Sequence, residues 1–250
     1  MDLQLIWYLL IGVLLVGYAV LDGYDLGVGI LYPFVTRTEN EKRELRTAIG
    51  PVWDGNEVWL ITAGGALFAA FPFVYATVFS GFYLAIMLLL FSLIFRAVSV
   101  EYRAKDPAWR GVWDRVFFVS SALIALLLGV TVGNLVRGVP LTAEGEFDGN
   151  FFTLLHPYPL LVGVVTVAMF VVHGAAWGAL RTQGDLRDRL VSARKLGAPV
   201  LLGLFALTTA ATFLAAPDRM DSIFGSVLGW LMLLLVVAGL VAPLVRAMSE

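Results

Sequence analysis

Residues 21–29 read LDGYDLGVG and lie inside an otherwise apolar run that extends over residues 3–34. Asp22 and Asp25 are three residues apart, so they share one face if the run is helical. Each acid costs about 2.5–3.5 kcal/mol near the centre of a bilayer on insertion scales. The stretch therefore predicts a buried functional or pairing site within a membrane helix. The alternative is that the two acids cap a short helix near the lipid headgroups.

The glycines of this stretch predict close helix packing around the two acids. Gly23 and Gly27 have the small-x-x-x-small spacing that lets membrane helices approach each other closely, and Gly29 follows two residues later. We expect the backbone of a neighbouring helix to contact this part of the chain.

The composition is that of a helical membrane protein. Hydrophobic residues make up 60% of the 250 residues, charged residues 14%, and mean hydropathy is +0.86, whereas soluble proteins carry about 25% charged residues. The net charge of −2 gives no indication of nucleic-acid binding, and the absence of cysteine excludes disulfides and thiolate-held cofactors. The first basic residue is Arg37, which favours a retained first span over a cleaved signal peptide. Seven segments of about 20 residues or more are apolar enough to span a bilayer: 3–33, 52–73, 77–100, 114–136, 157–180, 197–216 and 223–245.

The basic residues predict the orientation of these spans. Most Lys and Arg residues lie in or next to the connections after the first, third and fifth spans, and Arg246 follows the last span. The exceptions are Arg137 and Arg219. Because cytoplasmic loops are enriched in Lys and Arg, we expect the N-terminus outside and the C-terminus in the cytoplasm.

A second pair of acids opens the second span. Asp54 and Glu57 repeat the three-residue spacing and lie, on the predicted orientation, at the same cytoplasmic depth as Asp22 and Asp25. Like charges in a low dielectric cannot all ionise, so we expect at least one of the four to hold a proton, as a proton relay or a cation site requires. The alternative for Asp54 and Glu57 is that they are first-turn acids that satisfy free helix amides.

Other polar residues of the spans have weaker signals. Arg96 either pairs with one of these acids or extends to the headgroups. His156 and His173 are isolated from each other in the predicted topology, which makes haem ligation by His173 a minor alternative. We predict no metal site and no catalytic residue in this chain.

Five segments together resemble subunit II of the cytochrome bd quinol oxidases. They are LDGYDLGVG at 21–29, GPVWDGNEVWLITAGG at 50–65, the 71–82 segment with FSGFY, 95–103, and GVTVGNLVRGVP at 129–140. They are long, contiguous and in the family's order, and the likeness continues through 149–161 to the last span.

The resemblance implies a subunit of a terminal oxidase of a prokaryotic cytoplasmic membrane, which oxidises quinol and reduces oxygen to water. The b- and d-type haems are expected in a partner, subunit I, with none bound by this chain, and a small accessory subunit is a further partner. Asp22, Asp25 and Asp54 match the family's acids of a proton path from the cytoplasm. Trp53 matches a tryptophan beside which some members hold a quinone with a structural role. Glu57 is the fourth acid that we place in this path, and it departs from the family's pattern, in which other members have Gln at this position.

The resemblance also implies two four-helix bundles and a peripheral helix, which is more than seven spans provide. We therefore expect a single integral-membrane domain, 1–250, with a complete first bundle in 1–136 and a partial second bundle in 157–245, in either a fragment or a shortened form. Two other functions use the same features: a proton- or cation-coupled carrier and a purely structural membrane scaffold.

Overall fold

The chain is all-helical in the computed structural model, which describes residues 2–249 and, for side chains, residues 2–241. The α-helices are α1 Leu3–Val35, α2 Glu39–Thr47, α3 Trp53–Ala70, α4 Pro72–Gly81, α5 Tyr83–Tyr102, α6 Arg110–Arg137, α7 Pro157–Arg181, α8 Gly184–Ala215, α9 Pro217–Phe224 and α10 Val227–Ser249. Two short 3₁₀ helices, η1 Pro107–Trp109 and η2 Phe151–Leu154, precede α6 and α7. The all-α membrane architecture expected from the composition is confirmed.

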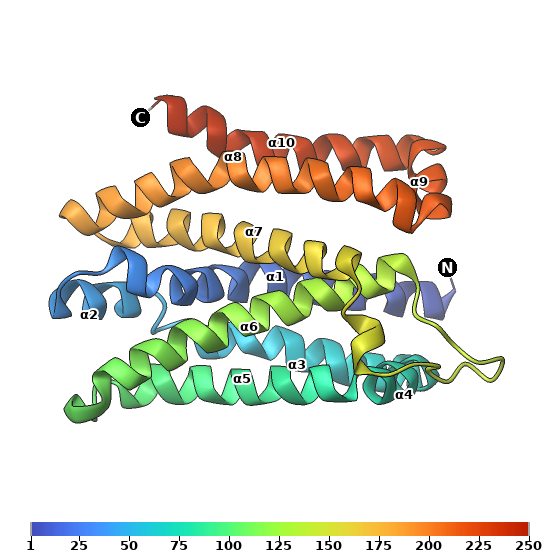
Figure 1. Ribbon diagram of the computed structural model, residues 1–250, viewed down its shortest axis with the longest axis horizontal. Coiled ribbons are helices and arrows are strands. Elements are labelled where there is room, and N and C mark those ends of the chain that lie inside the picture. Colours follow the sequence, from blue (N-terminus) through green and yellow to red (C-terminus); the bar gives the residue numbers. More distant parts are fainter. Residues whose placement is uncertain (1, 250) are drawn as a thin grey trace.

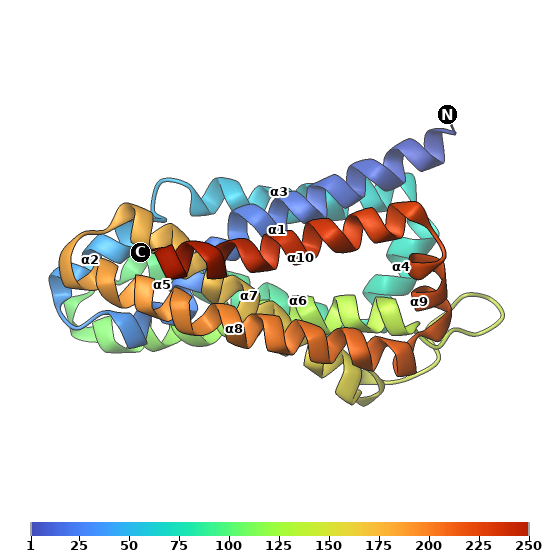
Figure 2. The ribbon, with the colours of Figure 1, turned by 90° about the horizontal axis from the view of Figure 1, so that it is seen from above.

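The long helices run side by side along one axis, so the connections gather at two ends (Figures 1 and 2). One end holds α2, the α5–α6 connection and the α7–α8 connection, and most of the basic residues lie in these segments or in the helix turns next to them. The other end holds the N-terminus, α4, α9 and the 138–156 connection. Most of the basic residues therefore share one end, as the sequence predicts, whereas the side of the membrane that this end faces stays a prediction. The side chain of Arg246 lies outside the described residues.

Helix α1 divides into an exposed half and a buried half. At about 1.5 Å per residue its 33 residues are about 50 Å long, which exceeds the roughly 30 Å hydrocarbon core of a bilayer. The side chains of its first half point largely outward, whereas every residue from Asp22 to Tyr32 is buried among α3, α6 and α7. The LDGYDLGVG stretch is thus the part of α1 that the rest of the fold encloses.

The glycines of this stretch lie against neighbouring helices. A Cβ atom at Gly27 would lie 1.8 Å from the carbonyl oxygen of Phe170 on α7, and one at Gly174 would lie 2.4 Å from the carbonyl carbon of Gly27. A Cβ atom at Gly29 would lie 2.1 Å from the Ser121 hydroxyl on α6. The close approach predicted from the glycine spacing is confirmed, and the close neighbours are α7 and α6.

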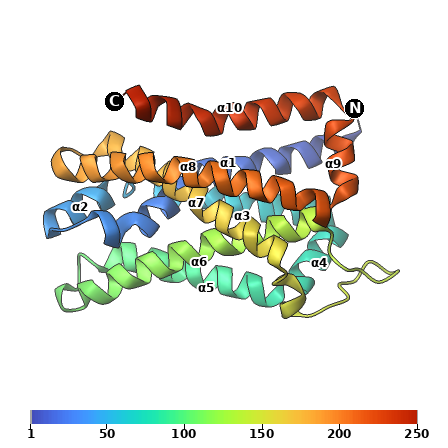
Figure 3. The ribbon, with the colours of Figure 1, turned by 45° about the horizontal axis from the view of Figure 1, so that its top comes forward.

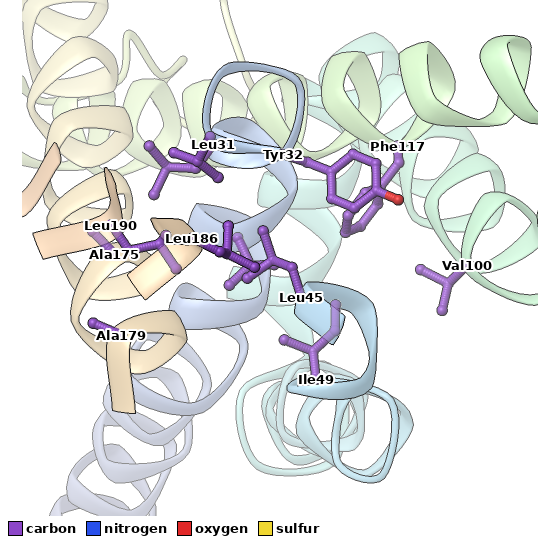
Figure 4. Packing of buried hydrophobic residues seen from close by; sticks show 12 residues of the cluster. Leu31, Tyr32, Leu45, Ile49, Val100, Phe117, Ala175, Ala179, Leu186 and Leu190 are labelled. Atoms are coloured by element: carbon purple, nitrogen blue, oxygen red, sulfur yellow. The ribbon is translucent and has the colours of Figure 1, made fainter. Parts of the chain in front are cut away.

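A hydrophobic core at the α2 end joins the two halves of the chain (Figure 4). Leu45 of α2 is fully buried, and so is Leu186 at the start of α8. These side chains pack with Leu31, Tyr32 and residues of α7 in one cluster. The short helix α2 therefore covers one end of the hydrophobic core.

Ion pairs connect α2 to α6 on one side and to α8 on the other. Lys42 donates to Asp114 of α6 at 2.8 Å, and Arg103 after α5 pairs with Asp114. On the opposite side Arg189 of α8 pairs with Glu41, which also completes the capping box at the start of α2. The backbone N–H of Arg37 and the Arg189 guanidinium hold the pKa of Glu41 below its ordinary value, so this clamp is present at neutral pH.

The number of spans differs from the seven that the sequence predicts. Among the described residues, five helices are long and apolar enough to cross a membrane, or six if the bent pair α9 and α10 is one span. The predicted span at 52–73 is helical as α3 but is not one of them, because its 18 residues open with the polar sequence WDGNE. The count of seven is therefore not confirmed.

Prolines account for two of the breaks that hydropathy alone missed. Helix α3 ends at Ala70 and α8 at Ala215, because Phe71 and Ala216 each precede a proline, which pushes them out of the helical region. A further break at Phe82, where there is no proline, separates α4 from α5, so the helix of the predicted span at 77–100 begins at Tyr83. After Pro217 the chain turns by 97° between α9 and α10, and α10 returns along α8 at the edge of the molecule (Figure 3).

The division into two bundles stays a prediction. Helix α7, which the sequence assigns to the second bundle, packs extensively against α1 and α6 of the first as well as against α8. Within the described residues the two groups of helices share one packed interior.

We predict that Gly27→Ala destabilises the protein by about 1–3 kcal/mol, because the added methyl group forces α1 and α7 apart. Gly12→Ala is the matched control: it lies in the same helix, and its Cβ atom would meet nothing within 4 Å. The measurement is the unfolding midpoint of both variants in a detergent titration. Equal stability of the two variants would contradict the assigned helix contact.

Candidate functional site

Arg96 of α5 is the centre of a buried polar cluster. Its Nη2 atom donates to Asp22 Oδ1 at 2.6 Å and to Glu57 Oε1 at 2.7 Å, which links α5 to α1 and α3. The Arg96 and Asp22 side chains are 1% and 0% exposed, and that of Glu57 is 18% exposed. Arg96 thus pairs with two of the predicted acids and does not extend to the headgroups.

Asp25 is buried in the same interior, and its hydrogen-bond donor is the neutral side-chain amide of Asn56, whereas the donor to Asp22 is a cation. Asn56 Nδ2 donates to Asp25 Oδ2 at 2.8 Å, to the Tyr24 hydroxyl at 2.8 Å and to the Leu21 carbonyl at 3.2 Å. Asp22 and Asp25, one helical turn apart on α1, therefore have different partners: Asp22 pairs with the cationic Arg96, and Asp25 bonds to the neutral Asn56.

Asp54 is the predicted site residue that the fold does not bring into this cluster. It is an acid in the first turn of α3, it is exposed, and it has no hydrogen bond or ion pair within the described part of the chain. Glu57 follows one turn later on the same helix and turns inward to Arg96. The Glu57 carboxyl group thus bonds to Arg96. This contact replaces the alternative drawn from the sequence, in which the carboxyl group bonds to a free backbone amide in the first turn of the helix.

Several buried polar atoms of the cluster have no hydrogen-bond partner within the described residues. They are Asp22 Oδ2, Asp25 Oδ1, Arg96 Nη1 and the hydroxyl oxygen of Tyr18, which precedes Asp22 by one helical turn. Buried polar groups are normally paired, so each such atom calls for a chemical explanation. The two carboxyl oxygens, Asp22 Oδ2 and Asp25 Oδ1, can each accept a proton without losing an existing hydrogen bond.

The charges of the cluster do not balance if every acid is ionised. Three carboxyl groups, those of Asp22, Asp25 and Glu57, share the interior with one guanidinium group. An uncompensated charge in a low-dielectric interior costs several kcal/mol. The arrangement can therefore bind and release protons.

Both histidines make hydrogen-bonding contacts within this chain. His173 Nε2 lies 2.8 Å from the Val20 carbonyl oxygen, and its ring contacts Tyr24 edge-on. His156 caps the start of α7, where its Nδ1 accepts from the Tyr158 N–H. Within the described residues no group of three His, Cys, Asp or Glu side chains could hold a metal ion. Trp53, the predicted quinone contact, is partly buried against the core at the α2 end.

Sequence reasoning missed two tyrosines of this site. Tyr18 is four residues before Asp22, a helical spacing that could have placed it on the same face, and Tyr24 lies between the two acids in sequence. Tyr24 bonds Asn56 and stacks on Trp177 of α7 with 4.1 Å between the ring centroids. That contact depends on which helix packs alongside, which no pattern in α1 specifies.

Comparison with known proteins gives a consistent result along almost the whole chain. The family described as cytochrome bd terminal oxidase subunit II matches residues 3–250. Cytochrome bd-I ubiquinol oxidase subunit 2 of Escherichia coli (strain K12) is 49% identical over 211 residues, which are 82% of this chain and 56% of that protein. Cytochrome bd ubiquinol oxidase subunit 2 of Bacillus subtilis (strain 168) is 39% identical over 213 residues, which are 84% of this chain and 62% of that protein. The chain thus spans little more than half the length of the curated relatives that it matches.

We predict that Arg96→Gln destabilises the protein by about 3–5 kcal/mol, because it leaves two buried carboxyl groups without their cation. Glu57→Gln keeps an oxygen that accepts from Arg96 and should change stability by less than about 1 kcal/mol. Arg110→Gln, which removes a half-exposed guanidinium 3.8 Å from Glu39, is the control for charge loss. Unfolding midpoints measure all three; an Arg96→Gln variant as stable as Arg110→Gln would contradict the central ion pair.

Proposed function

Because the chain belongs to the subunit II family of cytochrome bd terminal oxidases, we propose that it is a scaffold and proton-supplying subunit of a respiratory quinol oxidase. It is a multi-pass protein of the bacterial cytoplasmic membrane. Relatives are named as ubiquinol oxidase subunits, and the activity that we propose is oxidation of a quinol coupled to reduction of oxygen to water. The observation that carries the proposal is the buried cluster in which one arginine faces three carboxyl groups.

The partner that completes this enzyme is a haem-bearing subunit I. Membership of the subunit II family supports placing the haems in that partner. Those haems supply the oxygen-reducing chemistry, whereas the residues of this chain would hold and pass protons. A structural quinone beside Trp53 and a small accessory subunit belong to the same proposal.

Of the three carboxyl groups of the cluster, that of Asp25 is the one that we propose holds a proton, because its neighbour is not a cation. Asp22 and Glu57 share the Arg96 guanidinium, so each of them has a cation within hydrogen-bonding distance. Within the described residues, the hydrogen-bond partner of Asp25 is the Asn56 amide, which donates to one carboxyl oxygen and leaves the other free for a proton. A neutral carboxyl group in that position avoids an uncompensated buried charge.

The proton path that we propose begins at Asp54 and continues inward. Asp54 is exposed, so it can exchange protons with the surroundings or with a partner chain. Glu57 is one helical turn away, and Arg96 joins it to Asp22, which shares a face of α1 with Asp25. The path thus runs from α3 to α1 past Arg96 of α5, and reduction of oxygen to water consumes the protons delivered.

The test uses the complete enzyme purified through a tag on this chain, with Asp25→Asn and Asp54→Asn as separate variants. We expect the dithionite-reduced spectrum to keep its b- and d-type haem bands, because the neutral isostere preserves packing. Oxygen consumption with quinol should fall by about an order of magnitude or more, because proton transfer is interrupted. Asp185→Asn, an exposed first-turn acid of α8, is the matched control and should leave the rate unchanged.

Two results would overturn parts of this proposal separately. Normal oxygen consumption by the Asp25→Asn and Asp54→Asn enzymes would remove the proton path and leave a scaffold. A colourless wild-type chain that purifies without any haem protein would contradict its place in an oxidase.

A further inference from the structure

A pocket of about 590 Å³ opens where α2, the start of α3 and the end of α7 meet. It is separate from the Arg96 cluster, since no residue of that cluster lines it. In Figure 1 these elements lie at the end of the molecule that carries most of the basic residues. The pocket has a charged rim and an apolar wall, and each is built from identifiable contacts.

Two arginines with no carboxylate partner form the charged rim. Arg43 of α2 donates through Nη2 to the Asn40 side chain at 3.3 Å, and Arg181 ends α7 with its guanidinium 4.5 Å from the Trp177 ring centroid. Neither takes part in an ion pair within the described residues, whereas Arg103 and Arg189 nearby each do. The two guanidinium groups therefore keep donors available for an anion.

The acid of this pocket is already engaged. Glu44 accepts a hydrogen bond from the backbone N–H of Gln183 at 2.9 Å, which draws its carboxylate toward the start of α8. With Arg43 and Arg181 opposite a single acid, the pocket keeps a net positive charge. Its electrostatics favour an anionic occupant.

Trp177 supplies a fixed apolar wall. Its indole N–H donates to the Ala48 carbonyl at 3.0 Å, and its ring stacks on Tyr24. Pro51 and Val52 line the same pocket beside it. A ligand held by the arginines would thus rest its less polar part against a rigid, non-polar surface.

The position of the pocket identifies the source of the anion. Helix α7 is one of the candidate spans and ends at Arg181, and α2 lies beyond the end of α1 (Figures 1 and 2). Tryptophan and arginine near the end of a spanning helix lie at the level of lipid headgroups. Basic pockets between membrane helices at that level bind anionic headgroups.

We propose that this pocket binds the phosphate-bearing headgroup of an anionic phospholipid. The forked guanidinium groups of Arg43 and Arg181 would each donate to phosphate oxygens, for which their planar geometry is suited. The glycerol portion would lie against Trp177 and Pro51, and the acyl chains would continue into the bilayer. Such a lipid would hold α2 to the end of α7, and this role is independent of the proposed oxidase function.

The test is native mass spectrometry of the full chain in detergent, with phosphatidylglycerol, phosphatidylcholine or inorganic phosphate added at equal concentrations. The quantity measured is the fraction of protein that retains one added molecule. In the wild type we expect phosphatidylglycerol to be retained several-fold more than phosphatidylcholine, and inorganic phosphate not to be retained. In the double variant R43Q/R181Q, retention of phosphatidylglycerol should fall on the order of tenfold.

The matched control is R37Q/R115Q, which removes two exposed arginines that make no ion pair within the described residues and do not line the pocket. It should retain phosphatidylglycerol as the wild type does. An equal fall in both double variants would show a general charge effect and overturn the proposal. Retention of inorganic phosphate that depends on Arg43 and Arg181 would assign a small-anion site instead. Equal retention of the two lipids by the wild type would overturn the proposal without recourse to any variant.

Discussion

The contact of Arg96 with Asp22 and Glu57 is the interaction on which the interior of this protein depends. Within a bilayer a guanidinium group has no water to replace a lost partner, so it must be paired by the protein. Here the two carboxyl groups come from different helices, and α5 reaches both α1 and α3 through this one side chain. The pairing fixes the relative rotation of three helices and places Asp25 one helical turn from a charged centre.

Close packing of the backbone makes this arrangement possible. Gly27 and Gly174 bring α1 and α7 together at a distance that no larger residue allows, and this encloses the acidic half of α1. At the end of the molecule, α2 packs against residues 28–35 of α1 with a buried leucine and makes ion pairs to α6 and α8. The polar cluster is therefore shielded on its flanks, while Asp54 on α3 stays accessible.

Much of this could be predicted from local patterns, and the failures have clear physical reasons. The spacing of Asp22 and Asp25 and the glycines around them predicted a buried, closely packed site, because helical periodicity fixes which residues share a face. The same periodicity cannot tell which face meets a partner, so the outward position of Asp54 and the stacking of Tyr24 on Trp177 required the fold. Hydropathy placed the apolar segments but not their ends: α8 begins at Gly184 within a charged stretch, since Leu186 and Leu190 bury one face of it.

The central physical claim is that this cluster stores a proton on Asp25 at neutral pH. The most direct measurement is the infrared spectrum of the purified protein in the carbonyl region of protonated carboxyl groups, for the wild type and for Asp25→Asn. The account predicts a band in the wild type that shifts on deuteration and is absent from the variant, while Asp185→Asn retains it. A wild-type spectrum with no band that depends on Asp25 would show that this carboxyl group is ionised and would contradict the account.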